Sequence, residues 1–149
     1  MFAPALATSL SQGDLFLGLY VPDLPSTAPA TRRLDGIVLS HDCEIDKNQE
    51  ALLIARFRPI IEISLSDSGN LRAGKVINAM HLPGTSQSPE GLIDFRFTFR
   101  IERSQLDRAM QAGGRVASMT PDGQSALQAY LFRFFARALP TDTTPPGAA

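Results

Sequence analysis

The sequence predicts a mainly β protein of the α+β class: a small antiparallel β-barrel followed by an amphipathic C-terminal helix. Three observations lead to this prediction. Short apolar runs bounded by glycine and proline recur in the first half of the chain, which is typical of buried strands. Residues 93–102 alternate between apolar and polar side chains, and residues 120–138 carry apolar side chains at helical spacing. The length of 149 residues and a hydrophobic content of 44% suit a single core.

Four strands are expected before residue 64. The first is the apolar run 15–21, which follows Gly13-Asp14 and stops at Pro22. Residues 22–31 contain three prolines and therefore predict a loop. Shorter apolar runs predict three further strands, with a polar turn at residues 40–47 after the first of them. These strands are expected at residues 36–39, 51–55 and 59–63.

A long strand is expected in the second half of the chain. Before it, residues 66–70 have the composition of a turn, residues 71–80 have room for one or two helical turns, and residues 83–89 predict a loop. The alternation over residues 93–102 then predicts a strand with one face on the core and one polar face. The apolar side is Ile93, Phe95, Phe97, Phe99 and Ile101, and the polar side is Asp94, Arg96, Thr98, Arg100 and Glu102.

The last expected element is a helix over residues 120–138. Thr120 is suited to cap it, and Pro121 is suited to its first position. Phe132 lies off the apolar stripe and is expected to be exposed. The single domain is predicted to span residues 13–139, between an N-terminal extension at 1–12 and a flexible tail at 140–149. The stripe itself consists of Leu127, Tyr130, Leu131, Phe134 and Phe135.

Composition and charge exclude several classes of protein. The net charge is −1, which argues against a basic coat over the whole surface but allows a local basic face. The single cysteine excludes an internal disulfide framework and fits a reducing compartment. No apolar run is long enough for a membrane helix. We therefore expect a cytoplasmic protein without membrane partners and without a cofactor.

Polar side chains crowd the end of the buried strand at residues 36–39. His41, Asp42, Cys43 and Glu44 follow it directly, with no glycine or proline among them. Thiolate and imidazole are zinc ligands, but no Cys-x-x-Cys spacing accompanies them, so no metal site is assigned. Cys43 with His41 or His81 as base is a nucleophile hypothesis, and a buried cysteine before a hydrated acidic turn is the structural alternative. We interpret the segment as the rim of a binding surface.

The polar face of the strand at 93–102 suggests a second site. Asp94, Arg96 and Arg100 lie in a row there, with successive same-face residues roughly 6.6 Å apart. This spacing suits the phosphates of a nucleic-acid backbone. Arginines elsewhere could extend the face into a basic groove, and the alternative is a solvated face on which Asp94 pairs with Arg96. The additional arginines are Arg32, Arg33, Arg56 and Arg58.

Several segments, taken in order, resemble the PemK/MazF-like toxin family. The resemblance covers most of residues 13–137. It implies an SH3-like barrel, a homodimer and, in active members, metal-independent cleavage of RNA. The segments are Gly13-Asp14-Leu15-Phe16, Arg32-Arg33, Ile37-Val38-Leu39-Ser40, Ile93-Asp94, Arg103-Ser104-Gln105-Leu106 and Arg115-Val116-Ala117-Ser118-Met119-Thr120.

The sequence departs from the family pattern at three positions. Leu34 follows Arg33 where the family has proline, Pro59 follows Arg58 where it has threonine or serine, and the glutamine that usually follows the acidic residue is missing after Asp94. The resemblance nevertheless makes Arg33, Arg58 and Asp94 the catalytic candidates. The binding candidates are His41, Asp42, Cys43, Glu44, His81, Arg96 and Arg100.

Three functions remain open at this point. The first is a divergent PemK/MazF-like protein that interacts with RNA, as an endoribonuclease toxin if it is an enzyme. The second is a non-catalytic SH3-like module of a phage or toxin–antitoxin system, which binds RNA or an antitoxin-like protein. The third is a thiol- or metal-dependent hydrolase that uses Cys43 and His81.

Overall fold

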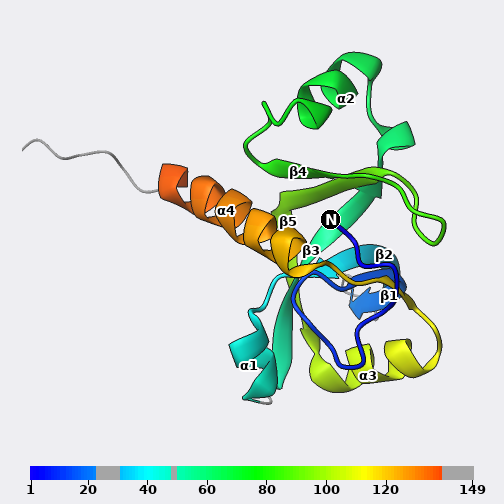
Figure 1. Cartoon of the computed structure of the whole chain (residues 1–149). Helices are drawn as coiled ribbons and strands as arrows, with labels where there is room; N and C mark the ends of the chain where they lie inside the picture. The colour runs from blue at the N-terminus through cyan, green and yellow to red at the C-terminus, as the bar shows by residue number, and fades with distance from the viewer. Residues whose placement is uncertain (23–30, 48–49, 139–149) are drawn as a thin grey trace, which may run out of the picture.

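The computed structural model describes residues 1–22, 31–47 and 50–138, and it has an α+β fold built on one antiparallel sheet (Figure 1). The six strands lie in the order β4-β5-β3-β2-β1-β6. The strands are β1 (Leu15–Pro22), β2 (Thr31–Val38), β3 (Ala51–Pro59), β4 (Ala79–Leu82), β5 (Gly91–Glu102) and β6 (Arg115–Ala117). The helices are α1 (Asp42–Asp46), the 3-10 turn η1 (Ile60–Glu62), α2 (Leu65–Arg72), α3 (Arg103–Gln111) and α4 (Pro121–Ala138).

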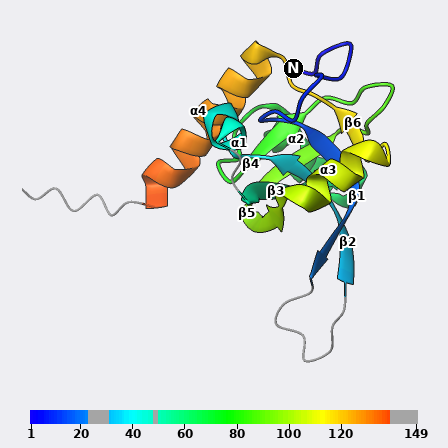
Figure 2. The same cartoon turned by 90° about the horizontal axis from the view of Figure 1, so that it is seen from below.

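The mainly antiparallel α+β class is confirmed, but the sheet is not closed into a barrel. Among the described strands, β4 and β6 form the two ends of the sheet and do not pair with each other. The outer ends of β1 and β2 leave the body as a two-stranded ribbon (Figure 2). In the described part of the chain, no helix combines the length and the apolar character needed to cross a membrane.

Two apolar cores pack on opposite faces of the sheet. The chain neighbours Ile37 and Val38 fall into different cores, as alternating strand residues must. One core lies under α4, which contributes the fully buried Leu127, and we name it the α4 core. The other lies under α3, which contributes the fully buried Leu106, and we name it the α3 core. A smaller cluster of Leu71, Ala79 and Leu92 lies under α2.

The long strand β5 serves both cores, which corrects the prediction that it has a single apolar face. Ile93 and Phe95 belong to the α4 core, whereas Phe99 and Ile101 belong to the α3 core. The apolar positions change face because the register with β3 shifts at one bulge: Ala55 faces Thr98, but the next residue, Arg56, faces Asp94. The predicted burial pattern is therefore wrong at two positions. Phe97 is 52% exposed, and Asp94 is fully buried.

Other elements differ from the expectations because their positions depend on packing rather than on local pattern. The polar segment at 40–47 forms the short helix α1 instead of a turn, and the strand expected at 59–63 is the end of β3 followed by η1. The helical turns come earlier than residues 71–80, in α2. The short strands β4 and β6 and the helix α3 were not expected. Most of the loop at 22–31 and the tail at 140–149 lie outside the described residues.

The C-terminal helix largely confirms its prediction. The Thr120 hydroxyl accepts a hydrogen bond from the Gly123 backbone N–H at 3.1 Å, so Thr120 caps the helix. Phe134 packs on the α4 core, with its ring centroid 5.8 Å from that of Phe95. Phe132 is 77% exposed as expected, but Phe135 is 54% exposed although it belongs to the predicted stripe. Both figures show the reason, since the C-terminal half of α4 runs out beyond the sheet.

A buried ion pair helps to hold the N-terminal residues against the sheet, beside backbone hydrogen bonds between residues 1–3 and residues 118–120. The Arg115 guanidinium donates a hydrogen bond to the Asp14 carboxylate at 2.9 Å. It also donates to the backbone carbonyls of Ala7 and Ser9, at 2.6 and 2.8 Å. Burial raises the pKa of the Asp14 carboxyl, and hydrogen bonds from Ser118 and Arg115 offset part of that rise. The Gly13-Asp14 pair, which contributes to the family resemblance, is therefore used to hold the N-terminal segment.

Candidate functional site

The strands β3 and β5 run between the regions of α2 and α3 (Figure 1), and polar side chains lie on the stretch between those two regions. The pairing register of β3 with β5 determines the position of this polar surface. Ile54 pairs with Phe99 in the α3 core, and Arg58 pairs with Leu92 beneath α2. The intervening position, where Arg56 faces Asp94, is covered by neither core. We name the set of Arg56, Arg58, Asp94, Arg96 and Phe97 the arginine surface.

Asp94 fixes the position of Arg96. The guanidinium of Arg96 donates two hydrogen bonds to the Asp94 carboxylate, at 3.0 and 2.8 Å, and the Arg96 backbone N–H donates a third at 3.1 Å. Burial by itself would raise the pKa of Asp94, but the hydrogen bonds and charge of Arg96 hold it below its ordinary value. The same contacts raise the pKa of Arg96. Asp94 is thus an ionised carboxylate whose two oxygens both accept hydrogen bonds from Arg96. The part of the Arg96 guanidinium that does not contact Asp94 faces solvent.

Arg58 is paired with Glu62 by charge but not by a hydrogen bond. Its buried Nε atom lies 3.6 Å from the Glu62 carboxylate, which is within ion-pair range, and it has no hydrogen-bond partner among the described residues. The side chain lines a cavity of about 330 Å³ beside α2, together with Asn78, Asp94 and Arg96. The exposed part of the side chain, 29% of its surface, is what a ligand can reach. A phosphate oxygen is an acceptor to which the arginine guanidinium is well matched.

Phe97 is flanked by two cations. The guanidinium carbon of Arg96 lies 5.9 Å from the centre of the Phe97 ring, and that of Arg56 lies 6.0 Å from it. Both distances are in the range of cation–π contacts. Phe97 is therefore an exposed aromatic ring with two positive charges close to it.

The structure brings together only some of the predicted site residues. Arg58 and Asp94, two of the three catalytic candidates, meet at the arginine surface, with the binding candidate Arg96 beside them. Arg33 does not join them, since it lies on β2 and its guanidinium stacks on Tyr20 at 5.5 Å. Arg100 lies towards the other end of β5, where it reaches the Ala51 backbone carbonyl at 3.4 Å.

The segment around Cys43 is used mainly to build α1. His41 caps the helix, because its Nδ1 accepts the Cys43 backbone N–H at 3.2 Å while the Glu44 carboxylate accepts the His41 backbone N–H at 3.2 Å. Asp42 accepts the Gln12 backbone N–H at 2.6 Å. Cys43 is exposed, which corrects the expectation of a buried cysteine, and its sulfur lies 3.2 Å from His41 Nδ1.

His81 is not part of that cluster. It lies on β4, towards the opposite end of the molecule from α1 (Figure 1). Its Nε2 is 2.8 Å from the Glu90 carboxylate, which also accepts hydrogen bonds from Arg72 at 2.7 and 3.0 Å. Arg72 first, and His81 second, lower the pKa of Glu90 to about 2. Within the described ranges, no three His, Cys, Asp or Glu side chains are grouped to hold a metal ion.

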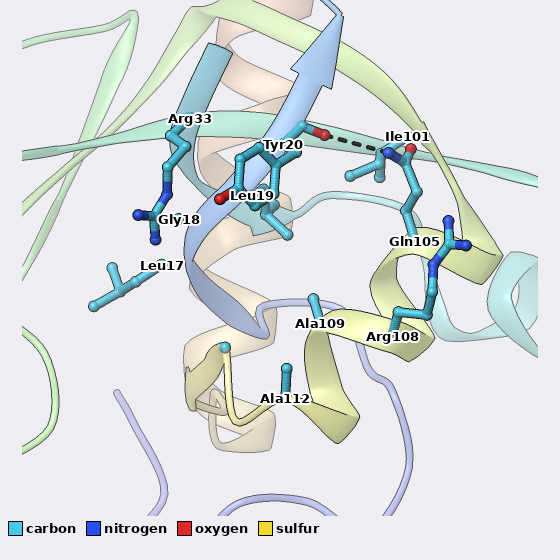
Figure 3. A pocket seen from close by; sticks show the side chains of 11 residues that line it. Leu17, Gly18, Leu19, Tyr20, Arg33, Ile101, Gln105, Arg108, Ala109 and Ala112 are labelled. Carbon is cyan, nitrogen blue, oxygen red and sulfur yellow. Dashed lines mark hydrogen bonds between the residues drawn. The ribbon is translucent and has the colours of Figure 1, made fainter. Parts of the chain in front are cut away.

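A separate cavity of about 420 Å³ lies between β1 and α3 (Figure 3). Its lining includes Arg33 from β2 and Arg108 from α3. The aliphatic side chains of the lining come from β1, from β5 and from α3 with the residue that follows it. Sequence reasoning missed this cavity because α3 was not expected. A signal for it was available at Gly18, since a glycine inside an apolar strand often marks a bulge.

Comparisons with known proteins add no relative. No family model matches the chain, and no curated protein matches it either. The resemblance to the PemK/MazF-like toxins therefore stays a prediction. The geometry of the arginine surface and of the β1–α3 cavity is what bears on function.

Proposed function

We propose that this protein binds single-stranded nucleic acid, RNA in the first instance, through the arginine surface. One observation carries the proposal: the guanidinium groups of Arg56 and Arg96 lie 6.0 and 5.9 Å from the centre of the exposed Phe97 ring. Arg58, on the same surface, adds a partly exposed guanidinium group. Single-strand binders combine these two features, since cations follow the backbone and aromatic rings stack the bases.

Each group has a definite role in the proposed complex. Arg56 and Arg58 are two positions apart on β3, roughly 6.6 Å along the strand, and they bind neighbouring phosphates. Phe97 stacks on a base, which requires no particular base identity. Arg96 binds phosphate with the side of its guanidinium that Asp94 does not occupy. A local basic face of this kind is compatible with a net charge of −1, because only the surface that meets the ligand has to be positive.

The geometry favours a positioning role for Asp94 over a role as a general base. Its carboxylate is fully buried, both oxygens accept hydrogen bonds from Arg96, and its pKa is lowered. A general base must reach the proton that it removes and must have a pKa suited to accepting it. Binding is therefore the proposed activity. Cleavage of RNA and a role in a toxin–antitoxin or phage system stay predictions from the resemblance.

The salt dependence of RNA binding tests the proposal. Fluorescence anisotropy with a short labelled RNA of mixed sequence is measured over a series of KCl concentrations. Three phosphate contacts predict a slope of about −2 in log K against log salt, because each contact on a single strand contributes about −0.7. Arg56→Gln and Arg58→Gln each make the slope shallower by about 0.7. The matched control is Arg108→Gln, an exposed arginine on α3 that leaves the slope unchanged.

A slope near zero contradicts binding at the arginine surface. The same holds if Arg108→Gln makes the slope shallower by as much as Arg56→Gln does. A denaturing gel of the same RNA tests cleavage. Fragments that appear in the presence of EDTA and disappear with Asp94→Asn support the endoribonuclease hypothesis, and intact RNA argues against it.

A further inference from the structure

The cavity between β1 and α3 results from an incomplete sheet edge. β6 pairs with β1 only at Leu15 and Phe16, so the outer edge of β1 beyond Phe16 meets α3 instead of another strand. Contact across this gap is sparse. The Gln105 side-chain amide donates to the Tyr20 backbone carbonyl at 3.4 Å, as Figure 3 shows, and the Leu17 backbone N–H donates to the Gly114 carbonyl at 2.9 Å. The remaining space is the cavity.

Gly18 shapes one wall of this cavity. The register of β1 with β2 shifts between Phe16 and Leu19, and Gly18 adopts a positive φ of 71° at that bulge. Its backbone N–H donates to the Asp35 carboxylate at 2.8 Å, which fixes the bulge. The guanidinium of Arg33 lies directly over Gly18, where any Cβ would collide with it. Glycine is therefore required both by the backbone conformation and by the place that Arg33 occupies.

The lining has an apolar floor and a cationic rim. The volume of about 420 Å³ is typical of sites for small organic molecules. The floor is aliphatic, and none of the lining residues is acidic. Within the described residues, neither Arg33 nor Arg108 forms an ion pair. The aliphatic lining residues are Leu17, Leu19, Ile101, Ala109 and Ala112.

We propose that this cavity binds a small organic anion that consists of an apolar body and one carboxylate or phosphate group. The apolar body packs on Leu17, Leu19 and Ile101, where burial of its surface drives binding. The anionic group pairs with Arg33, whose guanidinium is held over Gly18 by its contact with Tyr20. Figure 3 shows Arg108 on the other side of the opening, from where it adds positive potential.

This site is independent of the arginine surface. The two share no lining residue, and the ligand here is a small molecule rather than a polymer. Binding at either place can fail without affecting the other. Arg56→Gln, which is expected to weaken RNA binding, is therefore the control for Arg33→Gln in the present case, and both substitutions remove one positive charge.

Isothermal titration calorimetry of the full chain with two probes tests the inference. Octanoate and 1-naphthoate each combine a carboxylate with an apolar body, and 1-octanol is the neutral counterpart. We expect at least one of the two anions to bind and octanol to bind more weakly. Arg33→Gln weakens the binding by about fivefold to tenfold, as expected for one charged hydrogen bond near solvent. Arg108→Gln weakens it less, and Arg56→Gln leaves it unchanged.

A second variant tests the location of the ligand independently of charge. Ala112→Trp places a large side chain at the cavity on the exposed end of α3 and abolishes binding, whereas Gln111→Trp, on the same helix but outside the lining, does not. The inference is overturned if neither anion binds or if octanol binds as tightly as octanoate. It is also overturned if Ala112→Trp binds normally, or if Arg56→Gln loses as much affinity as Arg33→Gln.

Discussion

Replacement of Phe97 by alanine tests whether the arginine surface binds RNA by base stacking as well as by charge. The ring is 52% exposed and contacts two guanidinium groups, so it contributes little to either core. Its loss removes two exposed cation–π contacts, each about 0.5–1 kcal/mol. We therefore expect Phe97→Ala to lower the free energy of unfolding by about 1–2 kcal/mol and to leave the protein folded.

We also expect RNA affinity to fall, although the protein stays folded. Stacking of one base on one aromatic ring contributes about 1–3 kcal/mol, which corresponds to a dissociation constant about 5- to 150-fold weaker in Phe97→Ala. The salt slope should stay at the wild-type value, because no cation is removed. Phe97→Tyr keeps a ring at the same place and should restore most of the affinity.

Phe135→Ala is the matched control for this experiment. Phe135 is 54% exposed, close to the value for Phe97, but it lies on α4 away from the arginine surface. Anisotropy with the same labelled RNA should detect no change for Phe135→Ala. Wild-type affinity in Phe97→Ala, or an equal loss in Phe135→Ala, would refute the stacking role and leave only a non-specific charge effect.

Three further predictions concern stability and assembly. Leu127→Ala removes a fully buried side chain from the α4 core and should cost about 2–5 kcal/mol in urea unfolding, and a smaller loss would mean that α4 is only loosely attached. The pKa of Glu90 is lowered to about 2 by Arg72 and His81, so its stabilising contribution is complete above the ordinary carboxyl pKa and is lost as the pH falls towards 2. The difference in melting temperature between wild type and Glu90→Gln should shrink over that interval, and a constant difference would exclude the linkage. Homodimer formation stays a prediction: light scattering should give a dimer that Phe132→Ser converts to a monomer, and a monomeric wild type at tens of micromolar would disprove it.

The parts of the fold that follow from local sequence were predictable. α4 has its capping residue Thr120, its proline at the first position and an apolar stripe, so its start and its buried face could be predicted. α3 was missed although Leu106, Ala109 and Met110 lie at helical spacing in a segment rich in good helix formers. Only Leu106 of its nine residues is buried, so no long apolar stripe drew attention to it. The short strands β4 and β6 exist only because longer strands offer them an edge, which a local pattern does not reveal.

The candidate site was predictable in its composition but not in its geometry. Asp94, Arg96 and Arg58 could be named because they lie on two strongly patterned strands. Their convergence depends on the pairing of β3 with β5 across more than thirty intervening residues, and that pairing is a tertiary property. The exposure of Phe97 was missed for the same reason, since a strict alternation of apolar residues gives no sign of a bulge.

The bulge in β5 explains why a polar surface exists at this place in the sheet. The apolar residues of β5 occupy alternate positions, so a regular β5 would supply them to one face of the sheet only. β5 supplies both cores by changing face between Phe95 and Phe99. At the crossover neither α2 nor α3 covers the strand, so Phe97 is left outside and Asp94 faces Arg56. The buried carboxylate must then be paired, because an unpaired charge there would be costly, and Arg96 pairs with it. The arginine surface thus lies at the irregularity that lets β5 contribute to both cores.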